Sequence, residues 1–151
     1  VKGYAADVRS EKSIAKAVAK LTYAFANANV PKVNVITGEA YGSAYVTMNS
    51  KALGADVTYA WPDASIGMMD ANEAAKIMYA DDIAKSADVQ SVISEKAAEY
   101  AALQSGVESA AARGYVDTII NPEDTRKYVA AAFEMLYTKR EDRPDKKHGT
   151  V

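Results

Sequence analysis

The sequence contains no cysteine and a single histidine, His148, near its C-terminal end. Thiol catalysis, disulfides and zinc–thiolate sites are therefore excluded, and neither a histidine-based triad nor a multi-histidine metal site can be built within the chain. No apolar run approaches the roughly 18 residues that a membrane span requires, and no signal peptide is visible. These absences favour a cytoplasmic protein whose chemistry uses neither a thiol nor an imidazole.

A strong charge of one sign is also missing. The 151 residues include 18 Lys and Arg against 20 Asp and Glu, which gives a net charge of −2. Binding to nucleic acid or to a membrane surface needs a basic field, so neither is predicted. Hydrophobic residues make up 49% of the chain, enough for one domain with a sizeable core. Val1 is not a methionine, which favours a piece excised or processed from a longer protein.

The segment 32–48, KVNVITGEAYGSAYVTM, organises the rest of the chain. Its first residues form an apolar, β-branched run typical of a strand, which Gly38 ends. The small residues around Gly42 then predict a sharp turn into a short helix. The first N–H groups of a helix have no partner within it, and they can stabilise an oxyanion at the positive end of the helix dipole. An ordinary strand–turn–helix connection, with glycine for tight packing, accounts for the same pattern.

Hydrophobic periodicity predicts helices alternating with short strands. The expected helices cover residues 11–27, 44–51, 71–80, 88–104 and 123–138, and the expected strands cover 32–37, 56–60, 65–69 and 115–120. This order favours an α/β layer structure with a small, partly parallel sheet. Four short strands make a small sheet with exposed edges, so we infer that a second half completes or covers the fold. We expect one domain over residues 1–138 and a charged tail over 139–151.

Several residues have local expectations of their own. Asp70 and Asp88 are expected to cap helices, and the pair Asp81-Asp82 fits a helix boundary better than a metal site. Trp61 fits a core or interface position better than a ring-stacking one. In the last helix Phe133 is expected to face inward with its apolar neighbours.

Three blocks of the sequence resemble one known family. In chain order they are NVPKVNVITGEAYGSAYVTMNSKALGADVTYAWPDASIGMM, AAARGYVDTIINPEDTRKYV and KREDRPDKKHG, and the resemblance as a whole extends from about Lys20 to Gly149. They are similar to the C-terminal lobe of the biotin-dependent acyl-CoA carboxyltransferases. That family includes propionyl-CoA carboxylase β subunits and the carboxyltransferase subunits of sodium-pumping methylmalonyl-CoA and glutaconyl-CoA decarboxylases.

The resemblance implies a crotonase-like fold and a division of labour between two lobes. The first lobe, absent from this sequence, binds the acyl-CoA, and the second receives the carboxylated biotin of a carrier protein or domain. The active site lies between the first lobe of one subunit and the second lobe of its partner, in an oligomer of two to six subunits. The family's second oxyanion hole is a Tyr-Gly-Gly-Ala-Tyr turn, and its two donor amides correspond here to Ser43 and Ala44, after Gly42.

The sequence departs from the family pattern at two site positions. Ser43 replaces the second glycine of the turn; its amide can still donate if its φ is ordinary, while its hydroxyl crowds the pocket or adds a polar contact. Val46 stands where the carboxylases often have Asp, which leaves the acyl specificity open. Tyr41 and Tyr45 flank the turn, and biotin-pocket lining and plain packing account for them equally well. A second hypothesis therefore stays open, a non-catalytic assembly module derived from the same lobe.

The C-terminal tail carries further family residues. Arg143, Pro144 and His148 match its Arg-Pro and Lys-Lys-His-Gly pattern. The resemblance implies a subunit contact there, and a simple solvated tail accounts for the charges as well. Near residue 70 the family commonly has Met-Gly where this chain has Met69-Asp70, which predicts local repacking.

Overall fold

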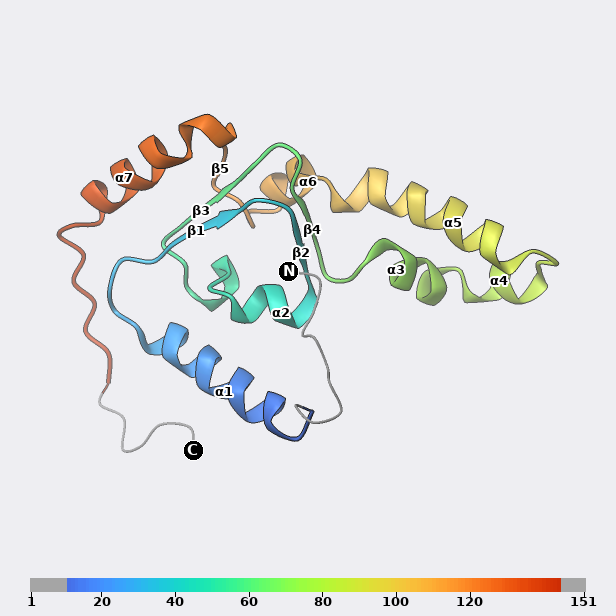
Figure 1. Ribbon diagram of the computed structural model, residues 1–151, viewed down its shortest axis with the longest axis horizontal. Coiled ribbons are helices and arrows are strands. Elements are labelled where there is room, and N and C mark those ends of the chain that lie inside the picture. Colours follow the sequence, from blue (N-terminus) through green and yellow to red (C-terminus); the bar gives the residue numbers. More distant parts are fainter. Residues whose placement is uncertain (1–10, 145–151) are drawn as a thin grey trace.

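The computed structural model describes residues 11–144 (Figure 1). Its strands form two small parallel sheets. The first sheet contains, in spatial order, β1 (Val33–Ile36), β3 (Val57–Ala60) and β5 (Thr118–Ile119). The second contains β2 (Glu39–Tyr41) and β4 (Ser65–Gly67). The parallel strands are joined by helical crossovers, as parallel pairing requires.

The two sheets are joined at a corner that both pairs of strands turn together. β1 leads into β2 through Thr37 and Gly38, and β3 leads into β4 through residues 61–64. Backbone hydrogen bonds continue across the corner, from Trp61 N to Ile36 O (2.9 Å) and from Ser65 N to Gly38 O (3.3 Å). Figure 1 shows the second pair of strands running at an angle to the first.

Seven α-helices surround these sheets in the described part of the chain. They are α1 (Glu11–Asn27), α2 (Gly42–Thr47), α3 (Ala71–Met78), α4 (Ala80–Lys85), α5 (Val89–Tyr100), α6 (Val107–Ala112) and α7 (Thr125–Met135). Short 3₁₀ segments cover Lys51–Leu53 and Pro122–Asp124, and a π-helical segment covers Ala101–Ser105. In Figure 1, α7 lies on one side of the first sheet and α2 on the other, while α3, α4 and α5 project as an arm.

Two apolar clusters make up the core around the sheets, one near the corner and α6 and one between the first sheet and α7. Around the corner and α6, the buried residues are mostly small or β-branched: Ile36, Ala40, Ala60, Ala64, Ile66, Val107, Ala110 and Val116. Between the first sheet and α7, the buried residues are Tyr59, Ile120 and Ala132, and Trp61 packs against them. The indole Nε1 of Trp61 also donates to Thr125 Oγ1 (3.0 Å), which confirms the core interpretation of this residue.

Helix ends follow the sequence closely. The Asp70 carboxylate accepts from Asn72 N (2.9 Å) and caps α3, and the Asp88 carboxylate accepts from Ser91 N (3.2 Å) and caps α5. The cap gives Asp70 a structural role. Asp81 and Asp82 lie in the first turn of α4, where acids are favoured. Among residues 11–144 no group of side chains has the makings of a metal site.

The structure corrects three local expectations. The segment Glu39–Tyr41 forms a strand that the sequence pattern does not reveal, because it is too short to show alternation. The helix expected at 44–51 is instead α2, which starts earlier, followed by a separate 3₁₀ turn. Phe133 is 46% exposed on the outer face of α7, whereas Ala132 beside it is buried. The small residue faces the sheet because α7 approaches it closely.

The first residues of the expected tail are held against the fold. Lys139 Nζ lies 2.8 Å from Asp56 Oδ1 and 3.3 Å from Val30 O, and its side chain is 13% exposed. Asp56 also accepts from Lys32 N (2.7 Å). Lys139 is therefore a structural contact and not part of a solvated tail. His148 lies outside the described residues, and the boundary at 138/139 stays a prediction.

Candidate functional site

The strand-to-helix turn at Gly42 depends on glycine for two reasons. Its φ is +60°, in the left-handed region that side chains disfavour. A Cβ added there would lie 3.2 Å from the carbonyl oxygen of Met68. Gly42 therefore allows β2 to turn directly into α2 while the segment after β4 passes close by. Among the described residues other than glycine, Asn49 alone has a positive φ. Ser43 therefore has an ordinary, negative φ, which is the condition for its amide to act as a donor.

The first turn of α2 presents its N–H groups without a side-chain cap. Tyr41 is the N-cap residue, and its side chain makes no capping hydrogen bond. The amides of Ser43 and Ala44 belong to this turn, where N–H groups have no acceptor within the helix. The positive end of α2 therefore lies at Gly42, beside the segment that follows β4.

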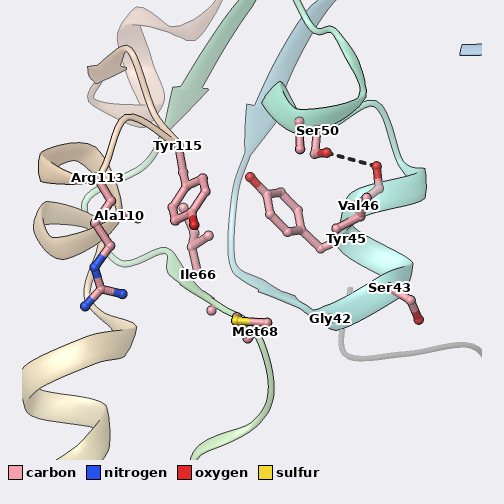
Figure 2. Close-up of a pocket in the computed structure, with 12 residues that line it drawn as sticks. Gly42, Ser43, Tyr45, Val46, Ser50, Ile66, Met68, Ala110, Arg113 and Tyr115 are labelled. Carbon is pink, nitrogen blue, oxygen red and sulfur yellow. Dashed lines mark hydrogen bonds between the residues drawn. The ribbon is translucent and has the colours of Figure 1, made fainter. Parts of the chain in front are cut away.

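A cavity of about 410 Å³ opens beside this turn (Figure 2). Four of the expected site residues line it: Gly42, Ser43, Tyr45 and Val46. The opposite wall comes from distant parts of the chain, chiefly Ile66, Met68, Arg113 and Tyr115. The walls are mostly carbon, and the volume lies within the range of ordinary small-molecule sites.

The other two expected residues, Tyr41 and Ala44, are buried beneath the turn and do not line the cavity. Ala44 is 1% exposed and Tyr41 is 7% exposed, and neither side chain lines the cavity. The Tyr41 ring packs under Gly67, where an added Cβ would lie 3.6 Å from ring carbon Cδ1. Figure 2 shows the Ser43 hydroxyl pointing away from the other lining side chains. The expected crowding of the pocket by this hydroxyl is therefore not seen.

Tyr45 is the cavity residue with the most unusual surroundings. Its hydroxyl is buried and has no hydrogen-bond partner among the described residues. Burial raises the pKa of the Tyr45 phenol, and the nearby Tyr115 raises it further, so the phenol stays protonated at neutral pH. Ser50 lies close by in Figure 2, but its hydroxyl donates to Val46 O (3.0 Å).

Sequence reasoning misses the opposite wall of the cavity. Tyr115 begins the segment 115–120 that is expected to be a strand, so only a structural role is predicted for it. The strand β5 covers Thr118–Ile119 alone, and Tyr115 is 43% exposed and lines the site. Met68, 79% exposed, stands at the rim. These residues reach the turn because β4 pairs with β2 and because a bridge joins Ser65 to Gly106 before α6. No local signal reports that pairing, so a single sequence could not reveal this wall.

Within residues 11–144 no helix has the length and apolar character needed to cross a bilayer. The cytoplasmic location inferred from composition stays a prediction.

Comparison with known proteins identifies the family of the chain. A family model described as the carboxyl transferase domain matches residues 1–151. The chain is 48% identical to the propionyl-CoA carboxylase beta chain of Saccharopolyspora erythraea, over 88% of this chain and 25% of that protein. It is 45% identical to the methylmalonyl-CoA decarboxylase subunit alpha of Propionigenium modestum, over 88% of this chain and 26% of that protein.

A solved structure gives the same answer for the fold. The transcarboxylase 12S hexamer, crystallised with methylmalonyl-coenzyme A and methylmalonic acid, superposes with a TM-score of 0.91 at 43% identity. The match covers 99% of this chain and 29% of that one, which confirms the crotonase-like α/β class. The chain thus spans between a quarter and a third of the length of these relatives. It belongs to the carboxyl transferase domain family.

Proposed function

We propose that this chain is the biotin-side lobe of an acyl-CoA carboxyltransferase. It would receive the biotin of a carrier protein or domain and help to move a carboxyl group between carboxybiotin and an acyl-CoA. One observation carries the proposal: within a carboxyl transferase domain, Gly42 turns the chain so that the first amides of α2 lie beside a cavity of about 410 Å³. The size and apolar walls of this cavity suit a compact bicyclic ring.

The backbone is the proposed catalytic group. The ureido oxygen of bound biotin would carry negative charge in the transition state of the transfer, in which the bond between the carboxyl group and the ring nitrogen is only partly formed. The amides of Ser43 and Ala44 would stabilise that charge, and removal of one such donor typically costs about 10²–10³ in rate. Biotin supplies the nitrogen that carries the carboxyl group, and the protein supplies position and polarity.

The remaining site residues shape the pocket. Gly42 fixes the turn, Tyr41 supports it, and Tyr45 and Val46 form the wall that the ring would contact. Val46 is 41% exposed, so an apolar group stands at the mouth where the acyl-CoA would approach. The acyl-CoA itself would bind mainly to an N-terminal lobe supplied by a second chain or segment, within an oligomer of two to six subunits.

The hypothesis of a non-catalytic assembly module rests on Ser43 and on the short span of this chain, 25–30% of the length of relatives that it matches. The ordinary φ of Ser43 favours a working donor over a disabled one. A measurement of turnover separates the catalytic lobe from the non-catalytic module. The 151-residue chain is expected to show negligible decarboxylation of malonyl-CoA or methylmalonyl-CoA with free biotin. Turnover is expected once the CoA-binding lobe is supplied.

The test is a biotin-dependent decarboxylation assay on the chain combined with its CoA-side lobe. Gly42→Val should abolish most of the turnover, because the larger side chain distorts the turn. His148→Ala, outside the proposed site, should leave it unchanged. An assembly of normal oligomeric state without any turnover would favour the module, and robust turnover by the chain alone would refute the proposed division between lobes.

A further inference from the structure

The hydroxyl of Thr47 contacts the carbonyl groups of the two residues that carry the proposed donor amides. Thr47 is the last residue of α2, is 6% exposed and does not line the cavity. Its Oγ1 donates to Ser43 O at 3.0 Å and also lies 3.2 Å from Ala44 O, so one hydroxyl proton is shared between two consecutive carbonyl groups. A valine would have nearly the same shape, and a buried hydroxyl costs free energy unless it is hydrogen-bonded. The part of Thr47 that needs an explanation is therefore its hydroxyl and not its packing.

One of these two contacts acts on an amide of the proposed site. A peptide unit is planar and rigid, and it joins the carbonyl of one residue to the N–H of the next. Ser43 O and the N–H of Ala44 therefore belong to one unit and point in opposite directions, so a bond that holds the oxygen also fixes the direction of the N–H. Hydrogen bonds in a chain polarise one another and are strengthened by roughly 10–30% per bond. The bond from Thr47 thus both orients the Ala44 N–H and makes it a stronger donor.

The short helix α2 benefits from such a bond. It has six residues, Gly42–Thr47, and no side-chain cap at its N-terminal end, and helices this short are marginal on backbone bonds alone. The backbone bond past its end, from Met48 N to Tyr45 O, is 3.2 Å long, and Asn49 then takes a φ of +59°. The chain leaves the helix at once, and the hydroxyl of Thr47 ties the last residue of α2 to its first turn.

We propose that Thr47 is a positioning residue for the carboxyl transfer: its hydroxyl sets the direction and the donor strength of the Ala44 amide without contacting the ligand. The inference rests on the proposed function, in which that amide stabilises the charge on the ureido oxygen of biotin. Because that charge is greatest in the transition state, a misdirected amide loses more stabilisation there than in the complex with bound biotin. The loss should therefore appear in kcat and not in KM.

The chain offers a matched control in α1. Thr22 Oγ1 donates to Val18 O at 2.8 Å, four residues earlier, which is the same spacing as from Thr47 to Ser43. Thr22 is half-buried and does not line the cavity. Thr22→Val and Thr47→Val thus remove the same kind of bond with the same change of shape. Thr47→Ser keeps the hydroxyl and removes only a methyl group.

The experiment measures kcat, KM for free biotin and Tm. Decarboxylation of methylmalonyl-CoA by the chain combined with its CoA-side lobe gives the kinetic constants, and thermal unfolding of the same assembly gives Tm. For Thr47→Val we expect an unchanged KM and a kcat lowered about tenfold, less than the loss of about 10²–10³ for a donor removed outright. Thr47→Ser should recover most of the lost kcat. Thr22→Val should leave kcat and KM unchanged, and both valine variants should change Tm by similar small amounts, because each loses one bond of the same kind.

The outcomes separate the possible failures. An unchanged kcat for Thr47→Val, with wild-type turnover intact, would overturn the inference and leave the proposed function standing. Equal losses for Thr47→Val and Thr47→Ser would also overturn it, because the methyl group would then matter and not the hydroxyl. A Thr47→Val variant that fails to assemble, raises KM alone, or has a Tm far below that of Thr22→Val would do the same, since the hydroxyl would then serve stability or binding. A wild-type assembly without biotin-dependent turnover would refute the proposed function first, and this inference with it.

Discussion

Replacement of Gly42 by alanine should damage the fold and the site together. Gly42 has a φ of +60°, and its missing Cβ would lie 3.2 Å from the backbone oxygen of Met68. A left-handed conformation costs an alanine about 1–2 kcal/mol. The Met68 oxygen is backbone and cannot swing aside, so the segment after β4 must move by a few tenths of an ångström.

Three other glycines allow the two costs to be separated. Gly38→Ala should be close to neutral, because its Cβ meets nothing within 4 Å and its φ is not left-handed. Gly114→Ala carries the conformational cost alone, since its φ is +80° and its Cβ also meets nothing. Gly54 combines a φ of +101° with a flexible neighbour, Lys32 Nζ at 3.3 Å. Each Gly→Ala change also makes the unfolded chain less flexible, which stabilises the fold by about 0.4–1 kcal/mol and offsets part of each loss.

The expected order of destabilisation follows from these terms. Gly38→Ala should change the free energy of unfolding by less than about 0.5 kcal/mol. Gly114→Ala should lose roughly 1 kcal/mol, and Gly42→Ala roughly 2 kcal/mol because the contact adds overpacking. Urea unfolding followed by circular dichroism measures all three.

The functional half of the prediction uses the same variants. Gly42→Ala should lower biotin-dependent turnover in the assembly about tenfold or more, because the amides of α2 shift with the turn. Gly114→Ala should lower turnover far less for comparable stability. The reasoning is refuted if Gly42→Ala is as harmless as Gly38→Ala, or if Gly42→Ala and Gly114→Ala lose the same fraction of activity.

Three further predictions follow from contacts described above. Burial raises the pKa of Asp56, but hydrogen bonds from Lys139 and from Lys32 N outweigh that effect and leave the pKa below its ordinary value. The hydrogen bond that Lys139 donates to Asp56 raises the pKa of Lys139. The ion pair should stabilise the fold fully between about pH 4 and 10. Its contribution should be lost as the pH falls through the lowered pKa of Asp56 or rises through the raised pKa of Lys139. The difference in free energy of unfolding between wild type and Asp56→Asn, measured by urea unfolding, should therefore shrink below about pH 4. Asp70→Ala should lower the free energy of unfolding by about 1 kcal/mol through loss of the α3 cap, seen in the same assay, and a neutral result would mean that the cap is unimportant. His148→Ala should leave kcat of the intact assembly unchanged, with turnover measured and the oligomeric state checked by light scattering; a loss of turnover with intact assembly would require a side-chain mechanism.

Local chemistry makes much of the fold predictable. Asp70 and Asp88 cap helices where expected, because an acidic side chain satisfies free N–H groups wherever a helix begins. The turn at Gly42 is also predictable, since small residues that follow a β-branched run favour a sharp change of direction. These features depend on a few consecutive residues.

The failures depend on contacts between distant residues. β2 has three residues and exists because β4 lies beside it. Phe133 faces outward because α7 packs through Ala132. Tyr115 reaches the cavity only after the chain has passed through the α3–α5 arm and returned through α6. Periodicity cannot report such pairings, so the α2 side of the site is visible in the sequence and the opposite wall is not.

The corner between the two sheets has unequal inner and outer paths. Partners in the first sheet are 24 residues apart, as in Val33 and Val57, whereas partners in the second are 26 apart, as in Glu39 and Ser65. The connection from β3 to β4 is therefore two residues longer than the connection from β1 to β2. The extra residues belong to the turn at 61–64, where Ala64 N donates to Trp61 O (3.0 Å). The length of this turn sets how far the chain after β4 travels before it faces Gly42. A family member with a shorter turn would have a flatter sheet and a shallower pocket, even with every pocket residue unchanged.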